Sequence, residues 1–102
     1  MKHLDVTVYD MHVIQDILSA HLLPSTYVFL FGSRATNTAK PYSDLDLAID
    51  AGQPVSLGLM ASLTDAFEES LLSYKVDLVD WHQLSDAFKQ QIASHRQLIW
   101  PC

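Results

Sequence analysis

The segment 44–50 constrains the fold most, because charged and apolar residues alternate along it. A period of two is typical of a half-buried β-strand, whose successive side chains point to opposite faces. Asp44 and Asp46 therefore share a face, with their backbones about 7 Å apart. The apolar positions face the core: Leu45, Leu47 and Ile49. Two carboxylates this close repel each other unless a cation lies between them, and Mg²⁺ suits such hard oxygen ligands.

A turn of small residues precedes this strand, and ten residues separate Ser33 from Asp44. The apolar run 28–31 predicts a buried strand that leads into the turn. Gly32 lets the backbone bend sharply and approach a ligand closely. Ser33 is a suitable N-cap for a short helix, whose free N–H groups would favour a phosphate, and Arg34 would add a bidentate phosphate contact. The turn and the carboxylates together predict a site for a nucleoside triphosphate and two divalent metal ions. The structural alternative is a capped turn followed by a strand with a solvated acidic face.

A third acid is expected from the segment 74–80, which also reads as a strand. Asp77 points to the face opposite its apolar neighbours, and pairing beside 44–50 would bring facing side chains within about 5 Å. It could then share a metal and help to remove a proton from an attacking hydroxyl. Asp80 is interpreted as a cap for the next segment, and Asp50 as a strand-end residue too far along the strand to be a ligand.

The pattern Gly32-Ser33-x10-Asp44-x-Asp46 resembles the signature of the DNA polymerase β-type nucleotidyltransferase superfamily. The surrounding residues are similar to those of the minimal nucleotidyltransferases (MNT), in particular the MntA-like antitoxins encoded beside HEPN-domain toxins. The resemblance covers nearly the whole chain, and the family carries its third acid on a strand like that of Asp77. Asn37 stands where relatives often have glycine. Because Asn tolerates a left-handed backbone, the loop is expected to keep its shape.

The resemblance implies an Mg²⁺-dependent protein adenylyltransferase. In that family AMP passes from ATP to a tyrosine hydroxyl of the partner HEPN ribonuclease toxin, which neutralises the toxin. Gly32, Ser33 and Arg34 would then hold the triphosphate, and Asp44, Asp46 and Asp77 would hold magnesium. The expected assembly is a hetero-oligomer with the toxin. ATP comes from the resemblance alone, since no residue identifies an adenine pocket.

Composition limits the alternatives. The 102 residues predict a single domain over 1–102, with a net charge of −6 that argues against gripping nucleic acid through its phosphates. The single cysteine, Cys102, excludes an internal disulfide. No leader pattern or long apolar run is visible, so a cytoplasmic protein without membrane contact is expected.

The predicted fold class is α/β, a mixed sheet of about four strands with helices packed on it, like the polymerase β palm. Helices are expected from near Asp10 to Pro24, after a cap at Ser56 with an apolar stripe reaching Leu71, and from Ser85 to about Ser94. A short last strand on a sheet edge is expected at 98–100.

Two alternatives in function stay open. The chain could be a stoichiometric binding antitoxin with little catalysis, or a nucleotidyltransferase for a small-molecule hydroxyl. The second usually needs a further substrate-binding domain, which 102 residues do not provide. Two loop residues also have two interpretations each. Lys40 could reach phosphates or lie in solvent, and Tyr42 could stack on a base or line the loop.

Overall fold

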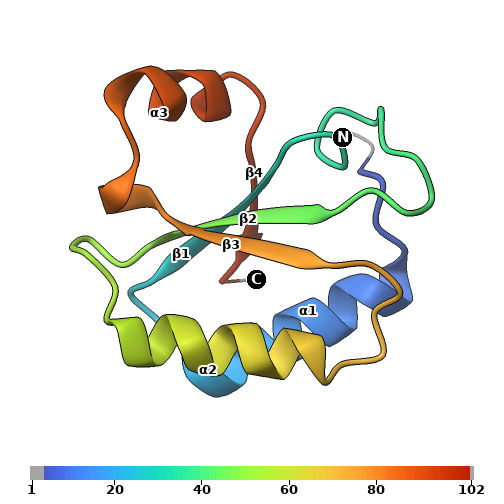
Figure 1. Cartoon of the computed structure of the whole chain (residues 1–102), viewed down its shortest axis with the longest axis horizontal. Helices are drawn as coiled ribbons and strands as arrows, with labels where there is room; N and C mark the ends of the chain where they lie inside the picture. Colours follow the sequence, from blue (N-terminus) through green and yellow to red (C-terminus); the bar gives the residue numbers. More distant parts are fainter. Residues whose placement is uncertain (1–3, 102) are drawn as a thin grey trace.

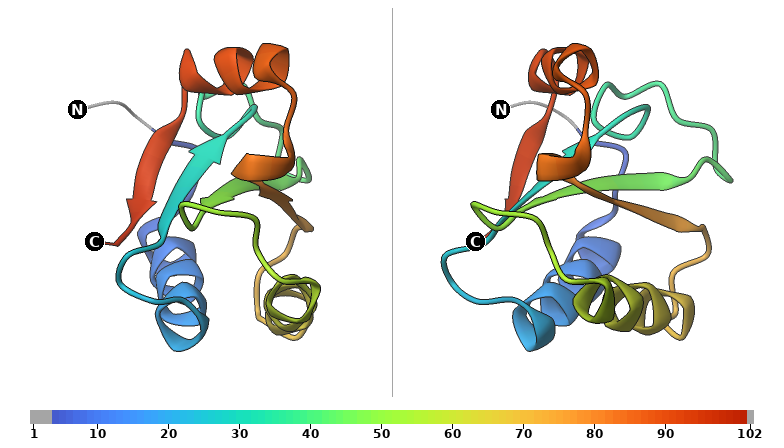
Figure 2. Two further views of the ribbon diagram at one scale, coloured as in Figure 1. Left: turned by 90° about the vertical axis from the view of Figure 1, so that its left-hand side faces the viewer. Right: turned by 60° about the vertical axis from the view of Figure 1, so that its left-hand side comes forward.

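The computed structural model describes residues 4–101 and contains a four-stranded mixed sheet with helices on both faces (Figures 1 and 2). The elements in chain order are α1 (Val8–His21), β1 (Tyr27–Phe31), β2 (Leu45–Asp50), α2 (Leu57–Glu68), β3 (Val76–Asp80), the 3-10 turn η1 (Trp81–Gln83), α3 (Asp86–Ala93) and β4 (Gln97–Trp100). The strand order is β3-β2-β1-β4. β1 runs antiparallel to both β2 and β4, whereas β2 and β3 are parallel and are joined by α2. The predicted α/β fold class is confirmed.

Side-chain caps set the starts of the three helices. Thr7, Ser56 and Ser85 each accept a hydrogen bond from a backbone N–H in the first turn, which satisfies a donor that the helix itself leaves unpaired. The caps at Ser56 and Ser85 are as predicted, but α1 begins at Val8 rather than near Asp10. The predicted stripe of α2 was too long, because the helix ends at Glu68 and Leu71 beyond it is exposed.

The strands agree closely with the sequence pattern. β1 begins one residue before the predicted run 28–31 and ends with it, and β2 and β3 begin one and two residues later than expected. β4 lies at a sheet edge, as predicted. The short helix expected after Ser33 was wrong: residues 33–37 form a hydrogen-bonded turn.

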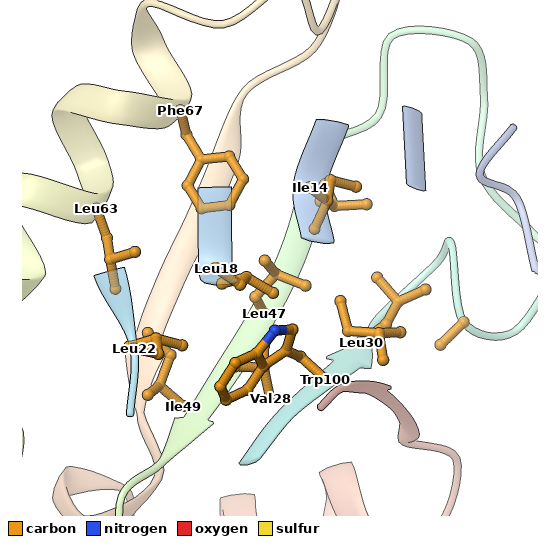
Figure 3. Close-up of a cluster of buried hydrophobic side chains, with 13 residues drawn as sticks. Ile14, Leu18, Leu22, Val28, Leu30, Leu47, Ile49, Leu63, Phe67 and Trp100 are labelled. Atoms are coloured by element: carbon orange, nitrogen blue, oxygen red, sulfur yellow. The ribbon is translucent and has the colours of Figure 1, made fainter. Parts of the chain in front are cut away.

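The larger hydrophobic core lies between the sheet and the helices α1 and α2. Figure 3 shows Ile14 and Leu18 of α1 and Leu63 and Phe67 of α2 directed towards the sheet, where the strands supply fully buried side chains. Those strand residues include Val28, Leu30, Leu45, Leu47 and Ile49. Because residues of a strand alternate between faces, the neighbours of these core residues on β2 must point to the other side of the sheet.

That other face carries α3 and a much smaller apolar cluster. Its buried members are Phe31 of β1, Ala48 of β2 and Ile92 of α3. Figure 1 shows α3 on the side of the sheet opposite to α1 and α2. Asp46 lies on the same face of β2 as Ala48, where it is only half buried. The second face is therefore divided between a small apolar cluster and a polar site. Within residues 4–101, no helix combines the length and apolar character that crossing a membrane requires.

Candidate active site

Strand register brings two of the three predicted acids together. Asp46 of β2 pairs directly with Asp77 of the parallel strand β3, so both side chains project from the same face of the sheet. Asp44 precedes β2 by one residue and is exposed. Asp77 and Asp44 both lie near enough to Asp46 for their charges to raise its pKa.

The negative charges of the neighbouring carboxylates disfavour the ionised form of Asp46. Burial, together with the nearby carboxylates of Asp77 and Asp44, raises the pKa of Asp46 from 3.8 to about 6. A cation among these oxygens would relieve that cost, because it stabilises the ionised form. As they stand, no three His, Cys, Asp or Glu side chains within residues 4–101 are arranged to hold a metal ion by themselves. Carboxylate oxygens are ligands that a hard cation such as Mg²⁺ accepts, with phosphate and water completing its coordination.

The Gly-Ser turn lies beside the acids. The antiparallel register pairs Phe31, the last residue of β1, with Asp46, so the turn that follows Phe31 begins beside this acid. Gly32 has a φ of 76°, in the left-handed region that glycine adopts readily. A Cβ at this position would overlap the Asp46 carboxylate Oδ2 and lie 3.2 Å from its Cγ. Only glycine lets the turn approach the carboxylate this closely.

Gly32 and Ser33 differ in whether their hydrogen-bond donors are already paired within the described part of the chain. The Gly32 N–H donates to Nε2 of His95 at 3.0 Å. The Gly32 carbonyl accepts from the N–H groups of Ala35 and Thr36. The Ser33 N–H and hydroxyl donate to no other residue within the described part of the chain. These two donors of Ser33 are thus available to a phosphate.

The structure gives Arg34 a role other than the predicted contact with phosphate. Its side chain is buried, with 6% of its surface exposed. The guanidinium donates to the backbone carbonyls of Ser43, Asp5 and Pro41 at 2.7 to 3.3 Å. It also stacks on the Tyr74 ring, 3.9 Å from the centroid. Because these partners occupy its donors, Arg34 ties down the loop that connects the Gly-Ser turn to β2.

The same loop contains the departure from the family pattern. Asn37 has a φ of 59°, so the expectation that it would adopt the left-handed backbone of the usual glycine is confirmed. Asp5, which lies before α1, helps to hold this loop: its carboxylate accepts a hydrogen bond from the Ala39 N–H at 3.1 Å. Lys40 and Tyr42 are exposed on this loop, and contact with phosphate or base stays a prediction for each.

Two further acids are not part of the site. Asp50 lies 2.7 Å from His82 Nε2. Burial alone would raise the pKa of Asp50, but hydrogen bonds from the Gly52 N–H and His82 outweigh it and lower the pKa. Asp80 accepts hydrogen bonds from the backbone N–H groups of His82 and Val55. The structure thus supports the interpretations of Asp50 as a strand-end residue and of Asp80 as a cap.

Sequence reasoning missed two residues beside the site. Lys75 Nζ lies 3.3 Å from Asp77 Oδ1, and both side chains are well exposed. Its position two residues before Asp77 on a predicted strand could have indicated this contact. His95 contacts Gly32 from 63 residues away, and no local sequence pattern signals such a contact.

A cavity of about 520 Å³ is separate from the acids. It lies between the segment before α1 and the loop around Arg34, and is lined by residues such as Asp5, Asp10, Lys40 and Tyr74. Tyr74 donates to Asp10 Oδ2 at 2.9 Å, and burial followed by this bond raises its pKa. The acids and the turn form an open surface site instead, as expected where substrate supplies part of the enclosure.

The turn, the paired strands and the acids define a nucleotidyltransferase site, and a family model agrees. The model described as "Polymerase beta, Nucleotidyltransferase" matches residues 13–101. The chain therefore belongs to the polymerase β-type nucleotidyltransferase family, which confirms the resemblance inferred from the motif.

Individual relatives show which members of this family the chain is similar to. The chain is 40% identical over 89 residues to the "Probable protein adenylyltransferase MntA" of Haemophilus influenzae, covering 87% of this chain and 77% of the relative. A solved toxin–antitoxin structure with AMP-PNP is similar with a TM-score of 0.76 and 25% identity, over 91% of this chain and 74% of that chain. A complex of tri-AMPylated Shewanella oneidensis HEPN toxin with MNT antitoxin shares the fold (TM-score 0.62, 22% identity, 90% and 73% covered).

Proposed function

We propose that this chain is an antitoxin that transfers AMP from ATP to a tyrosine hydroxyl of a cognate HEPN ribonuclease toxin. The observation that carries the proposal is the direct pairing of Asp46 with Asp77 beside the Gly-Ser turn, with Asp44 close enough for its charge to act on Asp46. The 40% identity to a probable protein adenylyltransferase supports the choice of reaction. The similarity to a toxin–antitoxin structure with AMP-PNP supports the choice of nucleotide and partner.

Each group of residues has a part in the reaction. The free donors of Ser33 would bind the triphosphate, and Gly32 would bring the backbone close to it. Asp44, Asp46 and Asp77 would hold magnesium, as two ions in keeping with the family, and the metal would supply positive charge against the phosphates and the leaving pyrophosphate. The acceptor oxygen forms a bond to the α-phosphorus while the bond from that phosphorus to the β-phosphate bridging oxygen breaks.

The proton of the acceptor hydroxyl also needs a destination. Asp77 is the more exposed member of the directly paired acids, so it faces the side from which a protein substrate arrives. We assign it the role of drawing this proton, which then passes to solvent. The described residues 4–101 form a single sheet with its helices, so the partner would bring its own tyrosine to the exposed side of the site.

The test is to incubate the chain with the HEPN protein encoded beside it, ATP and Mg²⁺, and to measure the intact mass of that protein. A gain in units of AMP is expected, and it should disappear with EDTA. The double variant Asp44→Asn, Asp46→Asn should abolish the gain while still binding the partner. Asp16→Asn, an exposed acid on α1, is the matched control and should keep full activity.

The same variants separate catalysis from simple binding. If the double variant still protects cells from the toxin as well as the wild type does, neutralisation is stoichiometric. If protection is lost although the complex forms, the transfer reaction neutralises the toxin. An intact wild-type chain that adds no AMP to its partner would contradict the proposed activity.

A further inference from the structure

His95 makes the one side-chain hydrogen bond to the Gly-Ser turn from the C-terminal part of the described chain. Its Nε2 lies 3.0 Å from the Gly32 nitrogen. A backbone N–H can only donate, so Nε2 must be the unprotonated acceptor and Nδ1 must carry the proton. Ser94 Oγ lies 3.3 Å from Nδ1 and can accept a hydrogen bond from the Nδ1–H group. The contact therefore fixes the tautomer of the imidazole as well as its position.

The segment that carries His95 is anchored on both sides. Before it, Ile92 is fully buried, and its carbonyl accepts from the N–H groups of His95 and Arg96 at 3.1 and 2.9 Å. After it, the Arg96 guanidinium lies 4.0 Å from the Phe29 ring centroid and 4.6 Å from that of Trp81. These contacts fasten the end of α3 to the sheet, so the imidazole meets the turn from an anchored segment in the folded protein.

The hydrogen bond acts at the point where the turn needs support. β1 ends at Phe31, so strand pairing does not extend to the Gly32 N–H. Gly32 is also the residue with the left-handed backbone that lies against the Asp46 carboxylate. A glycine with one external bond is conformationally restricted, whereas a glycine without it is the most mobile kind of residue.

We propose that His95 is a positioning residue for nucleotide binding: it holds the Gly-Ser turn through the Gly32 N–H, so that the donors of Ser33 point to the triphosphate. This inference rests on the proposed function for its ligand. His95 itself does not touch the nucleotide. Loss of its bond should therefore weaken binding of nucleotide while leaving the chemistry of the acids in place.

The experiment compares His95→Ala and His95→Gln with the wild type, using isothermal titration with AMP-PNP and Mg²⁺ and steady-state transfer to the partner. His95→Ala should weaken AMP-PNP binding and raise the KM for ATP by about three- to tenfold, the range for losing one ordinary hydrogen bond, with kcat changed by less than about twofold. His95→Gln offers a side-chain carbonyl near the position of Nε2 and should restore most of the affinity. His21→Ala, a half-buried histidine on α1, controls for general destabilisation.

Three results would overturn the inference: unchanged AMP-PNP binding by His95→Ala, equal loss by the Ala and Gln variants, or an equal loss in His21→Ala. A measurement on the wild type covers the case in which His95→Ala does not fold. ¹⁵N–¹H spectra of the imidazole should show a protonated Nδ1, and the Gly32 amide should be protected from exchange. A protonated Nε2 would overturn the inference as well. If the wild type bound no nucleotide, the proposed function would fail, while these spectra would still test the contact.

Discussion

At the scale of single residues, the close approach of Gly32 to Asp46 leads to a prediction about transfer activity. Gly32→Ala should reduce transfer activity at least about a hundredfold, because its Cβ would overlap the Asp46 carboxylate and push apart the two halves of the site. The left-handed backbone adds roughly 1–2 kcal/mol of destabilisation. Gly52→Ala is a matched control: its φ is 79°, but a Cβ there meets no atom within 4 Å. It should share the loss of stability and keep the activity.

Intact-mass assays and chemical denaturation of both variants check this prediction. Equal activity in Gly32→Ala and Gly52→Ala would show that backbone strain, and not the approach to Asp46, is what glycine provides at position 32.

The raised pKa of Asp46 leads to a prediction about how stability depends on pH. Its folded-state pKa of about 6 lies above the ordinary 3.8, so its favourable contribution to stability is complete below about pH 4 and is lost as the pH rises through 6. Above pH 7 the ionised carboxylate therefore costs stability. Asp46→Asn should raise the free energy of unfolding at pH 8 in EDTA by about 1 kcal/mol, a figure reduced from the full shift because the side chain is half exposed.

Denaturant unfolding at pH 4 and pH 8 checks this, with exposed Asp44→Asn as the control that should change stability less. Added Mg²⁺ should stabilise the wild type at pH 8 more than the Asp46→Asn variant, and this difference should shrink as the pH falls below 6, because protons compete with the metal. A destabilised Asp46→Asn at pH 8 would contradict the assigned repulsion.

At the scale of elements, Arg34 connects the loop 34–43 to the rest of the chain. Arg34→Ala would leave the carbonyls of Ser43, Asp5 and Pro41 without their shared donor and Tyr74 without its stacking partner. We expect a loss of about 2–4 kcal/mol in unfolding free energy without any nucleotide present. Arg34→Lys should recover little, since an ammonium lacks the planar fork that reaches several carbonyls.

Chemical denaturation of the nucleotide-free protein is the measurement, with Lys40→Ala, an exposed residue of the same loop, as control. If Arg34→Ala keeps its stability and instead only raises the KM for ATP, the side chain contacts phosphate after all, as the sequence motif suggested.

Alternation along 44–50 and 74–80 was enough to predict which face Asp46 and Asp77 share, because a strand has a fixed period. The direct pairing of Asp46 with Asp77 needed the register of β2 against β3, which only the folded chain provides. The phosphate contact predicted for Arg34 came from its place in the motif. In the folded chain, burial against carbonyls distant in the sequence decides its contacts instead. His95 could not be found because tertiary structure alone brings it to Gly32.

At the scale of the whole molecule, the two faces of the sheet differ in how firmly they are packed. The face towards α1 and α2 has a cluster of thirteen buried apolar residues, whereas the face under α3 has three. The stability of a layer follows the apolar surface that it buries. The layer that carries α3 and His95 should therefore open more readily than the layer of α1 and α2.

Native-state hydrogen exchange tests this difference. Backbone amides of α3 should exchange through an opening that costs clearly less free energy than global unfolding, while the central amides of α1, β1 and β2 should exchange near the global value. Nucleotide bound at the Gly-Ser turn should slow exchange in α3, because the turn is joined to the end of that helix through His95. Equal protection of all three helices without nucleotide would contradict the prediction. Exchange in α3 that ignores AMP-PNP, in a chain that binds it, would show that the turn and the helix are not coupled.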